Sequence, residues 1–424
     1  MAATNCHPER SEGSAVAEVP RRSRCRFLVA RAPRNDSLVA AVILASLLAA
    51  GPLGAAPFVP TDDAQVLERL PEKLDPSLLE LKRLRSALAQ NPDDLALAAR
   101  LARRAIEAAR EAGDPRYLGQ AQAALAPWWN LSDPPPAALL LRATLKQSTH
   151  DFTGALSDLD RLIAQRPTDG QALLTRATVL TVQGRYGDAR ADCARIARLT
   201  VPLVTSACAA APASLSGEAE NAYRSLAVAL ARQPDADAGL REWALTLSAE
   251  IAWRRGDPDA AETQFRAGLA LDRRDPYLLA AYADFLLDRD RAVEVVPLVR
   301  DYSRNDSLLL RLALAEARLP EMRAAFEAHR GDLASRFEAA RRRGDSLHRR
   351  EEARYTLGIL GDAPVALRLA RENWQVQKEP ADLLILVAAA LAARDAQTLD
   401  EARAWIDSHK LEDASIATLL KVKA

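Results

Sequence analysis

Two neighbouring stretches of the chain, residues 138–168 and 172–201, align without a gap at a constant offset. The matched pairs are Arg142 with Arg176, Ala143 with Ala177, Phe152 with Tyr186, Ala155 with Ala189, and Leu162 with Ile196. The offset, called the repeat period below, is about 34 residues, and self-similarity at such a period is typical of repeat architectures. In these folds each unit packs mainly on its neighbours. The repeat therefore constrains the fold more than any other feature of the sequence.

The composition indicates that each unit is helical. Only 5% of the residues are aromatic and only 17 of 424 are glycine, whereas 49% are hydrophobic. Sheet proteins of this size need more β-branched and aromatic residues and more turn glycine. Apolar residues recur at helical spacing, as in Leu139, Leu140 and Ala143, and no long stretch alternates apolar with polar residues. We therefore expect short amphipathic helices.

The pattern has three further parts: small residues at the same place in each unit, an aromatic residue that opens the second helix, and prolines that close the unit. It resembles the tetratricopeptide repeat over residues 78–410, most closely over 138–295. The resemblance implies an all-α, right-handed superhelical solenoid of antiparallel helix pairs; an irregular helical bundle is the alternative. Alanine is expected where two helix axes approach closely, because a larger side chain would push them apart. The expected packing residues are Ala143, Phe152, Ala155, Ala177, Tyr186, Ala189, Ala222 and Ala261.

The repeat register divides the chain. We expect a leader in residues 1–56, a linker in 57–77 and clear repeats in 78–304. The pattern weakens to degenerate helical repeats in 305–350, and residues 351–424 are expected to form C-terminal repeats and a cap.

The leader has features of an export signal. Residues 38–50 carry no charge, but they are too few to cross about 30 Å of hydrocarbon as a helix, which takes about 20 residues. Arginines precede this run and small residues follow it, as in secretory signal peptides. Cleavage is expected near Ala55, because Pro57 disfavours it directly after Ala56. Residues 1–37 resemble a translated intergenic repeat of bacteria, so the true start is expected near Leu38.

Cleavage would leave Cys193 and Cys208 in the mature chain. They are expected on consecutive helices, where the short turn at 199–203 would bring their Cα atoms within disulfide range. An oxidising compartment favours that bond. The alternative is two buried thiols.

The resemblance also implies a ligand surface, because relatives of this repeat bind along the concave face formed by the first helix of each unit. Carrying the corresponding positions over gives Trp243, Thr246, Glu250, Trp253 and Arg254 in one unit, and Tyr277, Asp284, Leu287 and Asp288 in the next. Aromatic rings beside acids suit an extended peptide or a basic helix. The alternative is that Trp243 and Trp253 fill the gap to a neighbouring unit.

Motifs for chemistry are missing from the sequence. It has no glycine-rich phosphate loop, no His-Glu-x-x-His, no Cys-x-x-Cys and no nucleophile elbow. We therefore predict no catalytic residues, no metal ligands, no cofactor and no enzyme activity. Lys and Arg together equal Asp and Glu at 57 each, which argues against nucleic-acid binding through bulk positive charge.

The expected function is that of an exported scaffold, periplasmic or secreted, that binds a protein or peptide partner through its concave face. One alternative is an assembly factor anchored in the inner membrane by an uncleaved leader. A second alternative is an enzyme subunit whose solenoid orients a substrate.

Overall fold

The structure, a computed structural model, describes residue 62 and residues 76–271, 275–344 and 348–421. The chain divides into two units, Met1–Glu72 and Lys73–Ala424, and every described helix lies in the second. The predicted leader, its cleavage site and nearly all of the linker 57–77 lie outside the described residues.

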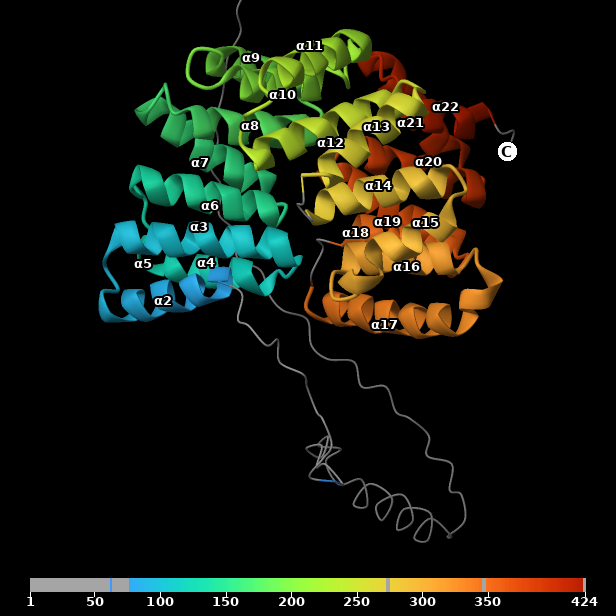
Figure 1. Ribbon diagram of the computed structural model, residues 1–424, viewed down its shortest axis with the longest axis horizontal. Helices are drawn as coiled ribbons and strands as arrows, with labels where there is room; N and C mark the ends of the chain where they lie inside the picture. The colour runs from blue at the N-terminus through green and yellow to red at the C-terminus, as the bar shows by residue number, and fades with distance from the viewer. Residues whose placement is uncertain (1–61, 63–75, 272–274, 345–347, 422–424) are drawn as a thin grey trace, which may run out of the picture. The chain divides into compact units, whose positions relative to one another are not determined.

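In the described ranges of the second unit all regular structure is helical (Figure 1). The N-terminal helices are α2 (Pro76–Gln90), α3 (Leu95–Ala112), α4 (Arg116–Ala124), α5 (Ala126–Trp129), α6 (Pro136–Ser148), α7 (Phe152–Gln165), α8 (Gly170–Val182) and α9 (Tyr186–Ile196). The central helices are α10 (Pro202–Ala213), α11 (Ala219–Arg232), α12 (Ala238–Arg254), α13 (Pro258–Leu269), α14 (Pro276–Asp288), α15 (Ala292–Val299) and α16 (Asp306–Glu316). The C-terminal helices are α17 (Arg323–Arg342), α18 (Arg349–Gly358), α19 (Ala363–Val376), α20 (Pro380–Ala393), α21 (Ala396–His409) and α22 (Ala414–Lys421), and 3₁₀ turns lie at Arg300–Tyr302 and Pro320–Met322.

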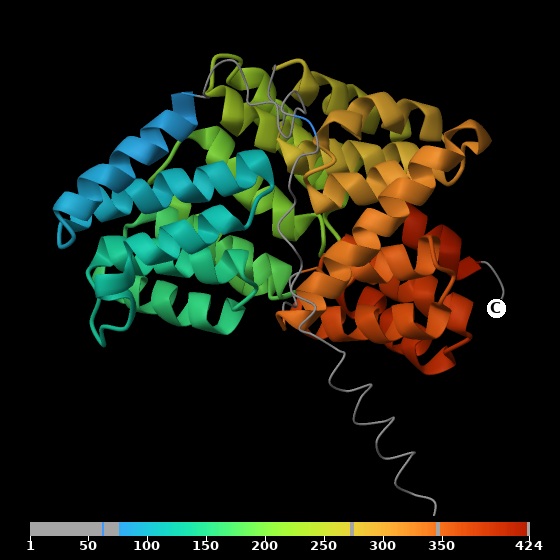
Figure 2. The same cartoon turned by 90° about the horizontal axis from the view of Figure 1, so that it is seen from below.

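The helices pack in sequential pairs. Each even-numbered helix from α6 to α20 packs on the odd-numbered helix that follows it, and the even-numbered helices also contact one another in chain order (Figures 1 and 2). The even-numbered helices therefore form one layer of the stack and the odd-numbered helices the other. The all-α solenoid of antiparallel helix pairs expected from the sequence is confirmed by this packing.

The small residues of the repeat lie where the paired helices cross. Ala143, Ala155, Ala189 and Ala261 have no exposed surface, and Ala177 and Ala222 are also buried. Phe152 and Tyr186, which open α7 and α9, are buried as well. The buried apolar residues form several successive clusters along the stack instead of one centre, as expected when each unit packs on its neighbours.

An ion pair to a buried aspartate recurs from one unit to the next. Arg142 on α6 donates two hydrogen bonds to Asp158 on α7 at 2.8 and 2.6 Å, and Arg176 on α8 donates two to Asp192 on α9 at 2.7 Å each. Both the arginines and the aspartates are separated by one repeat period. These bidentate pairs fix the two helices of each unit relative to one another.

The disulfide ties two of these units together. Cys193 on α9 and Cys208 on α10 are bonded, with their Cα atoms 5.5 Å apart. Both side chains are buried, in the cluster that also contains Ala177 and Ile196. The bond therefore crosses the boundary between the α8–α9 pair and the α10–α11 pair.

The turns between paired helices share a left-handed backbone conformation. The residues concerned have φ between 55° and 80°, and they are His150, Gly184, Gly217, Gly256, Asp290, Gly361 and Arg394. The C-terminal helices pack against several of these turns. A Cβ at Gly184 would lie 2.5 Å from Trp405 of α21, and one at Gly217 would lie 3.0 Å from Lys410. The backbone N–H of Lys378 also donates to the Val182 carbonyl oxygen at 2.7 Å. The far end of the stack thus contacts its middle.

The region 305–350 departs from the repeat in one respect. It contains α16 and α17, and α17 packs on α16, but α17 meets α18 through side chains, such as the Phe337 and Tyr355 rings and the Arg341–Glu352 ion pair, and not through close backbone packing. The weak repeat signal there coincides with this difference in packing. Separately, none of the described helices is long and apolar enough to span a membrane.

Gly184 and Gly344 form a matched pair for testing the packing of α21 on the α8–α9 turn. Both have positive φ, but Gly344 has open space where a Cβ would be. Gly344→Ala should cost about 1–2 kcal/mol through backbone strain alone. Gly184→Ala should cost about 1–3 kcal/mol more, because the new methyl group overlaps the Trp405 ring. Urea unfolding of the two variants measures the difference, and equal destabilisation would contradict the packing described here.

Candidate protein-binding surface

The even-numbered helices α12, α14, α16 and α18, with the start of α20, present a set of charged and aromatic side chains to one another. We call this set the inner surface: Glu250 on α12, Tyr277 and Asp284 on α14, Arg311 on α16, Arg350 and Arg354 on α18, and Glu379 and Asp382 at the start of α20. It contains three of the residues expected from the repeat register to line the concave face, namely Glu250, Tyr277 and Asp284.

Equivalent hydrogen bonds join successive first helices. The Tyr277 hydroxyl donates to Glu250 Oε1 at 2.8 Å, and Arg311 donates to Asp284 at 3.1 and 2.7 Å. In both cases the donor follows the acceptor by 27 residues, and the second bond lies one repeat period further along the chain. The repeat therefore sets which side chains meet between units as well as which helices meet within them.

The ion pairs continue beyond adjacent helices. Arg354 on α18 also donates two hydrogen bonds to Asp284, at 3.0 and 2.7 Å, although 70 residues separate them in sequence. Arg350, one turn earlier on α18, lies 2.9 Å from Glu379 and 3.4 Å from Asp382. These bonds hold α14, α18 and α20 in a fixed relation.

The environment shifts the pKa values of several of these groups. Burial raises the pKa of Glu250, although Arg254 and the hydrogen bond from Tyr277 oppose the shift. The Glu250 carboxylate raises the pKa of Tyr277 well above its ordinary value. Burial also tends to raise the pKa of Asp284. The positive charges of Arg311 and Arg354 outweigh this effect and hold the pKa of that carboxyl well below its usual range. At neutral pH Tyr277 is therefore a neutral donor and Asp284 is charged.

Other predicted surface residues lie elsewhere. Thr246 is buried, and its hydroxyl donates to the Glu242 carbonyl oxygen within α12, so it offers no group to a ligand. Trp253 packs edge-to-face on Phe285, and its indole N–H donates to Asp288 at 2.9 Å. Trp253 thus fills the gap between α12 and α14, which is the alternative that the sequence left open for it. Leu287 is buried.

Trp243 and Arg254 complete the predicted set. Trp243 is 39% exposed, so it does not close the gap to a neighbouring unit as Trp253 does. Arg254 donates to Ser214 on the loop after α10, at 3.0 Å. Asp288 accepts a second hydrogen bond, from Ser415 of α22, at 3.1 Å, so it also joins the stack to the C-terminal helix.

Several inner-surface residues were not identified from the sequence. Arg311 lies one repeat period after Tyr277, which itself lies one period after Trp243, so extending the register by one unit would have found it. Arg350 and Arg354 follow the region where the repeat weakens, and no fixed offset leads to them. Glu379 and Asp382 form a capping box at the start of α20, and a short-range motif of this kind does not reveal that they face Arg350.

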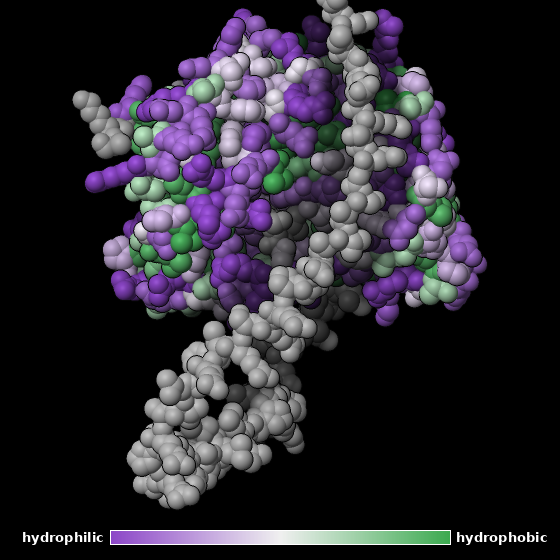
Figure 3. Space-filling view, turned by 180° about the vertical axis from the view of Figure 1, so that it is seen from behind, coloured by the Kyte–Doolittle hydropathy of each residue, from purple (hydrophilic) through white to green (hydrophobic). Residues whose placement is uncertain are grey.

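Within the described residues, no group of three or more His, Cys, Asp or Glu side chains is arranged to hold a metal ion. The face of the molecule seen in Figure 3 is largely hydrophilic, with apolar side chains in small areas.

Comparison with known proteins gives similarity to solved structures only. No family model matches this sequence, and no curated protein matches it. A tetratricopeptide repeat protein from Parabacteroides merdae is 17% identical, and the match covers 60% of this chain and 92% of that one with a TM-score of 0.39. A Rap protein complexed with competence and sporulation factor is 12% identical over 81% of this chain and 98% of that one, with a TM-score of 0.45. The Cut9–Hcn1 complex gives 12% identity, 78% and 63% coverage, and a TM-score of 0.45.

The chain's own geometry defines its class. Sequential helix pairs, buried crossing alanines and bonds that recur with the repeat period describe a tetratricopeptide-like helical repeat protein.

Asp382 gives a test of the inner surface by pH. Burial raises the pKa of its carboxyl from 3.8 to about 6, although Arg350 opposes the shift and Asn373 donates a hydrogen bond to it. Its protonated form therefore favours the fold, and this contribution is fully present below pH 4 and lost as the pH rises through about 6. A shift of this size corresponds to at most about 3 kcal/mol.

The measurement compares the unfolding free energy of the native protein with that of Asp382→Asn between pH 4 and 7. The native protein should lose stability relative to the variant as the pH rises. Other carboxylates titrate in both proteins and cancel in the difference. A difference that stays constant over this range would contradict the assignment.

Proposed function

We propose that this protein is a non-catalytic scaffold that binds an extended segment of a partner protein along its inner surface. Tetratricopeptide-like folds usually serve protein binding. The observation that carries the proposal is Tyr277, which is 58% exposed on a first helix while its hydroxyl is held by Glu250 on the neighbouring first helix.

Tyr277 is suited to recognition because it is both exposed and oriented. A tyrosine ring buries a large area on binding and loses little conformational entropy, especially where a hydrogen bond already fixes it. Glu250 sits beside the ring, so a basic side chain of the partner would find a carboxylate next to an apolar surface. This combination favours a segment in which a basic residue is close to an apolar one.

Trp243 extends the same surface by one unit. It occupies the position one repeat period before Tyr277 and is also exposed. Neighbouring helix axes lie about 8–10 Å apart. In the polyproline II conformation three residues make one turn and span about 9 Å, so side chains three residues apart lie on the same side. A partner segment with apolar side chains three residues apart would therefore place one on each ring.

For the compartment, we propose export, which the disulfide supports. Structural disulfides persist in oxidising compartments and are rare in the cytosol. Cys193 and Cys208 form such a disulfide, and both side chains are buried. The leader that would direct export lies outside the described residues.

The inner surface is tested with Trp243→Ala combined with Tyr277→Ala, using Val293→Ala as a control. Val293 is 65% exposed on α15, a second helix, so its truncation leaves the inner surface unchanged. A partner captured from the native envelope fraction should be retained by the native protein and the control. The double variant should lose at least tenfold in affinity, because both apolar contacts are removed.

Circular dichroism must first show that the double variant is folded like the native protein. Capture of the same partners by the double variant at unchanged affinity would overturn the inner-surface proposal.

Export is tested by mass spectrometry of protein isolated from its native source. The expected mature N-terminus lies near residues 55–57, and a non-reduced digest should contain the peptide that links Cys193 to Cys208. An intact leader would favour the membrane-anchored alternative. Free thiols at both positions would remove the support from the disulfide.

A further inference from the structure

A groove lies between α10 and α11, on helices that contribute nothing to the inner surface. It encloses about 760 Å³, and its lining includes Ser206, Arg224, Ser225, Val228, Ala229 and Arg232. The α11 residues recur at intervals of three and four, so they form one face over the whole length of that helix. Figure 1 shows α9 and α11 at the upper edge of the stack.

The side chains that line the groove suit the docking of a helix. Its lining includes small side chains, Ser206, Ser225 and Ala229, which allow another backbone to approach closely. Val228, which also lines the groove, is 49% exposed at the middle of the α11 face. The exposed Val228 beside these small residues gives the groove an apolar centre.

The charges of the groove have one sign. Arg224 and Arg232 are its only ionisable lining residues. Arg224 lies 3.3 Å from Glu220, but that carboxylate is also paired with Arg255. Among the described residues Arg232 forms no ion pair. The groove therefore has an excess of positive charge on both sides of Val228.

From this arrangement we infer that the α10–α11 groove binds an acidic amphipathic helix of a partner protein. Arg224, Val228 and Arg232 lie at intervals of four residues, so the two arginines are about 12 Å apart along the helix axis. A partner helix lying along α11 would place an acidic residue at each arginine. An apolar residue midway between the two acids, four positions from each, would contact Val228. The opposite charges set the register, and the apolar contact at Val228 supplies buried area.

A membrane surface with anionic lipids is a different class of partner. A bilayer presents a broad surface, whereas the features here are a concave groove between two helices and two arginines at a fixed spacing. The helix is therefore the occupant that the geometry favours.

The probe is a fluorescently labelled, alanine-based peptide with Glu, Leu and Glu at four-residue intervals. A length of about 18 residues allows such a peptide to be helical in isolation. Its control is an isomer of the same composition with the two glutamates moved off the leucine face. The native protein should bind the first peptide at least tenfold more tightly than the isomer, measured by fluorescence anisotropy. Absence of detectable binding, or equal affinity for both peptides, would overturn the inference.

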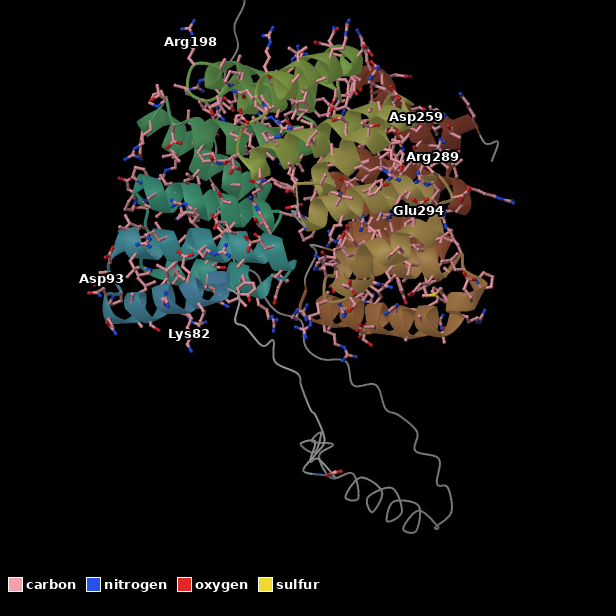
Figure 4. All side chains as sticks on the ribbon, in the orientation of Figure 1. Lys82, Asp93, Arg198, Asp259, Arg289 and Glu294 are labelled. Carbon is pink, nitrogen blue, oxygen red and sulfur yellow. A yellow bond between two sulfur atoms is a disulfide. The ribbon has the colours of Figure 1, made fainter. Side chains whose placement is uncertain are left out.

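Variants locate the binding on the protein. Arg224→Glu combined with Arg232→Glu should weaken binding of the Glu peptide at least tenfold and should favour a peptide in which Lys replaces both glutamates. Arg289→Glu, an exposed position in the α14–α15 turn labelled in Figure 4, is the matched control and should bind like the native protein.

The last measurement is binding of the protein to vesicles of phosphatidylglycerol and phosphatidylcholine. Binding to these vesicles that is lost in the double variant, with no preference between the two peptides, would assign the groove to a membrane surface and reject the helix. Circular dichroism confirms that the variants are folded. Because the groove shares no residue with the inner surface, either proposal can fail while the other holds.

Discussion

The close approach of two helices at an alanine is the contact on which this molecule depends. Ala143 and Ala155 are fully buried, as are Ala189 and Ala261, so the paired helices meet without space for a larger side chain. A single pair of this kind cannot bury its own apolar surface, and it must pack on the next pair. The apolar clusters that follow one another along the chain are the result.

Contacts of this local kind would leave distant units of the stack independent, but contacts of longer range connect them. Asp284 accepts hydrogen bonds from Arg311 on the next first helix and from Arg354 on the one after it. The α8–α9 turn receives a backbone hydrogen bond from Lys378, and the Trp405 ring packs on Gly184. A simple array of repeats would unfold unit by unit, whereas these connections between distant units favour more cooperative unfolding.

The fold could be predicted from the sequence because the repeat period is a local property, visible in Ala143 and Ala177 without knowledge of any distant contact. The candidate binding surface could be predicted only in part, because some of its contacts depend on more than the repeat period. Glu250, Tyr277 and Asp284 follow the register and meet on the inner surface. Trp253 follows it too, but its ring packs on Phe285 between two helices, a distinction that depends on the spacing of helix axes.

Partners from distant positions could not be predicted. Arg354 reaches Asp284 across 70 residues, and Glu379 and Asp382 read locally as a helix cap although they face Arg350. Because these ion pairs satisfy most of the charges of the inner surface, the groups left to a ligand there are an exposed ring and the carboxylate beside it. The α10–α11 groove differs in this respect, since its arginines are not fully neutralised within the fold. The partners we propose for the two surfaces therefore carry opposite charges, a basic segment at Glu250 and an acidic helix at Arg224 and Arg232.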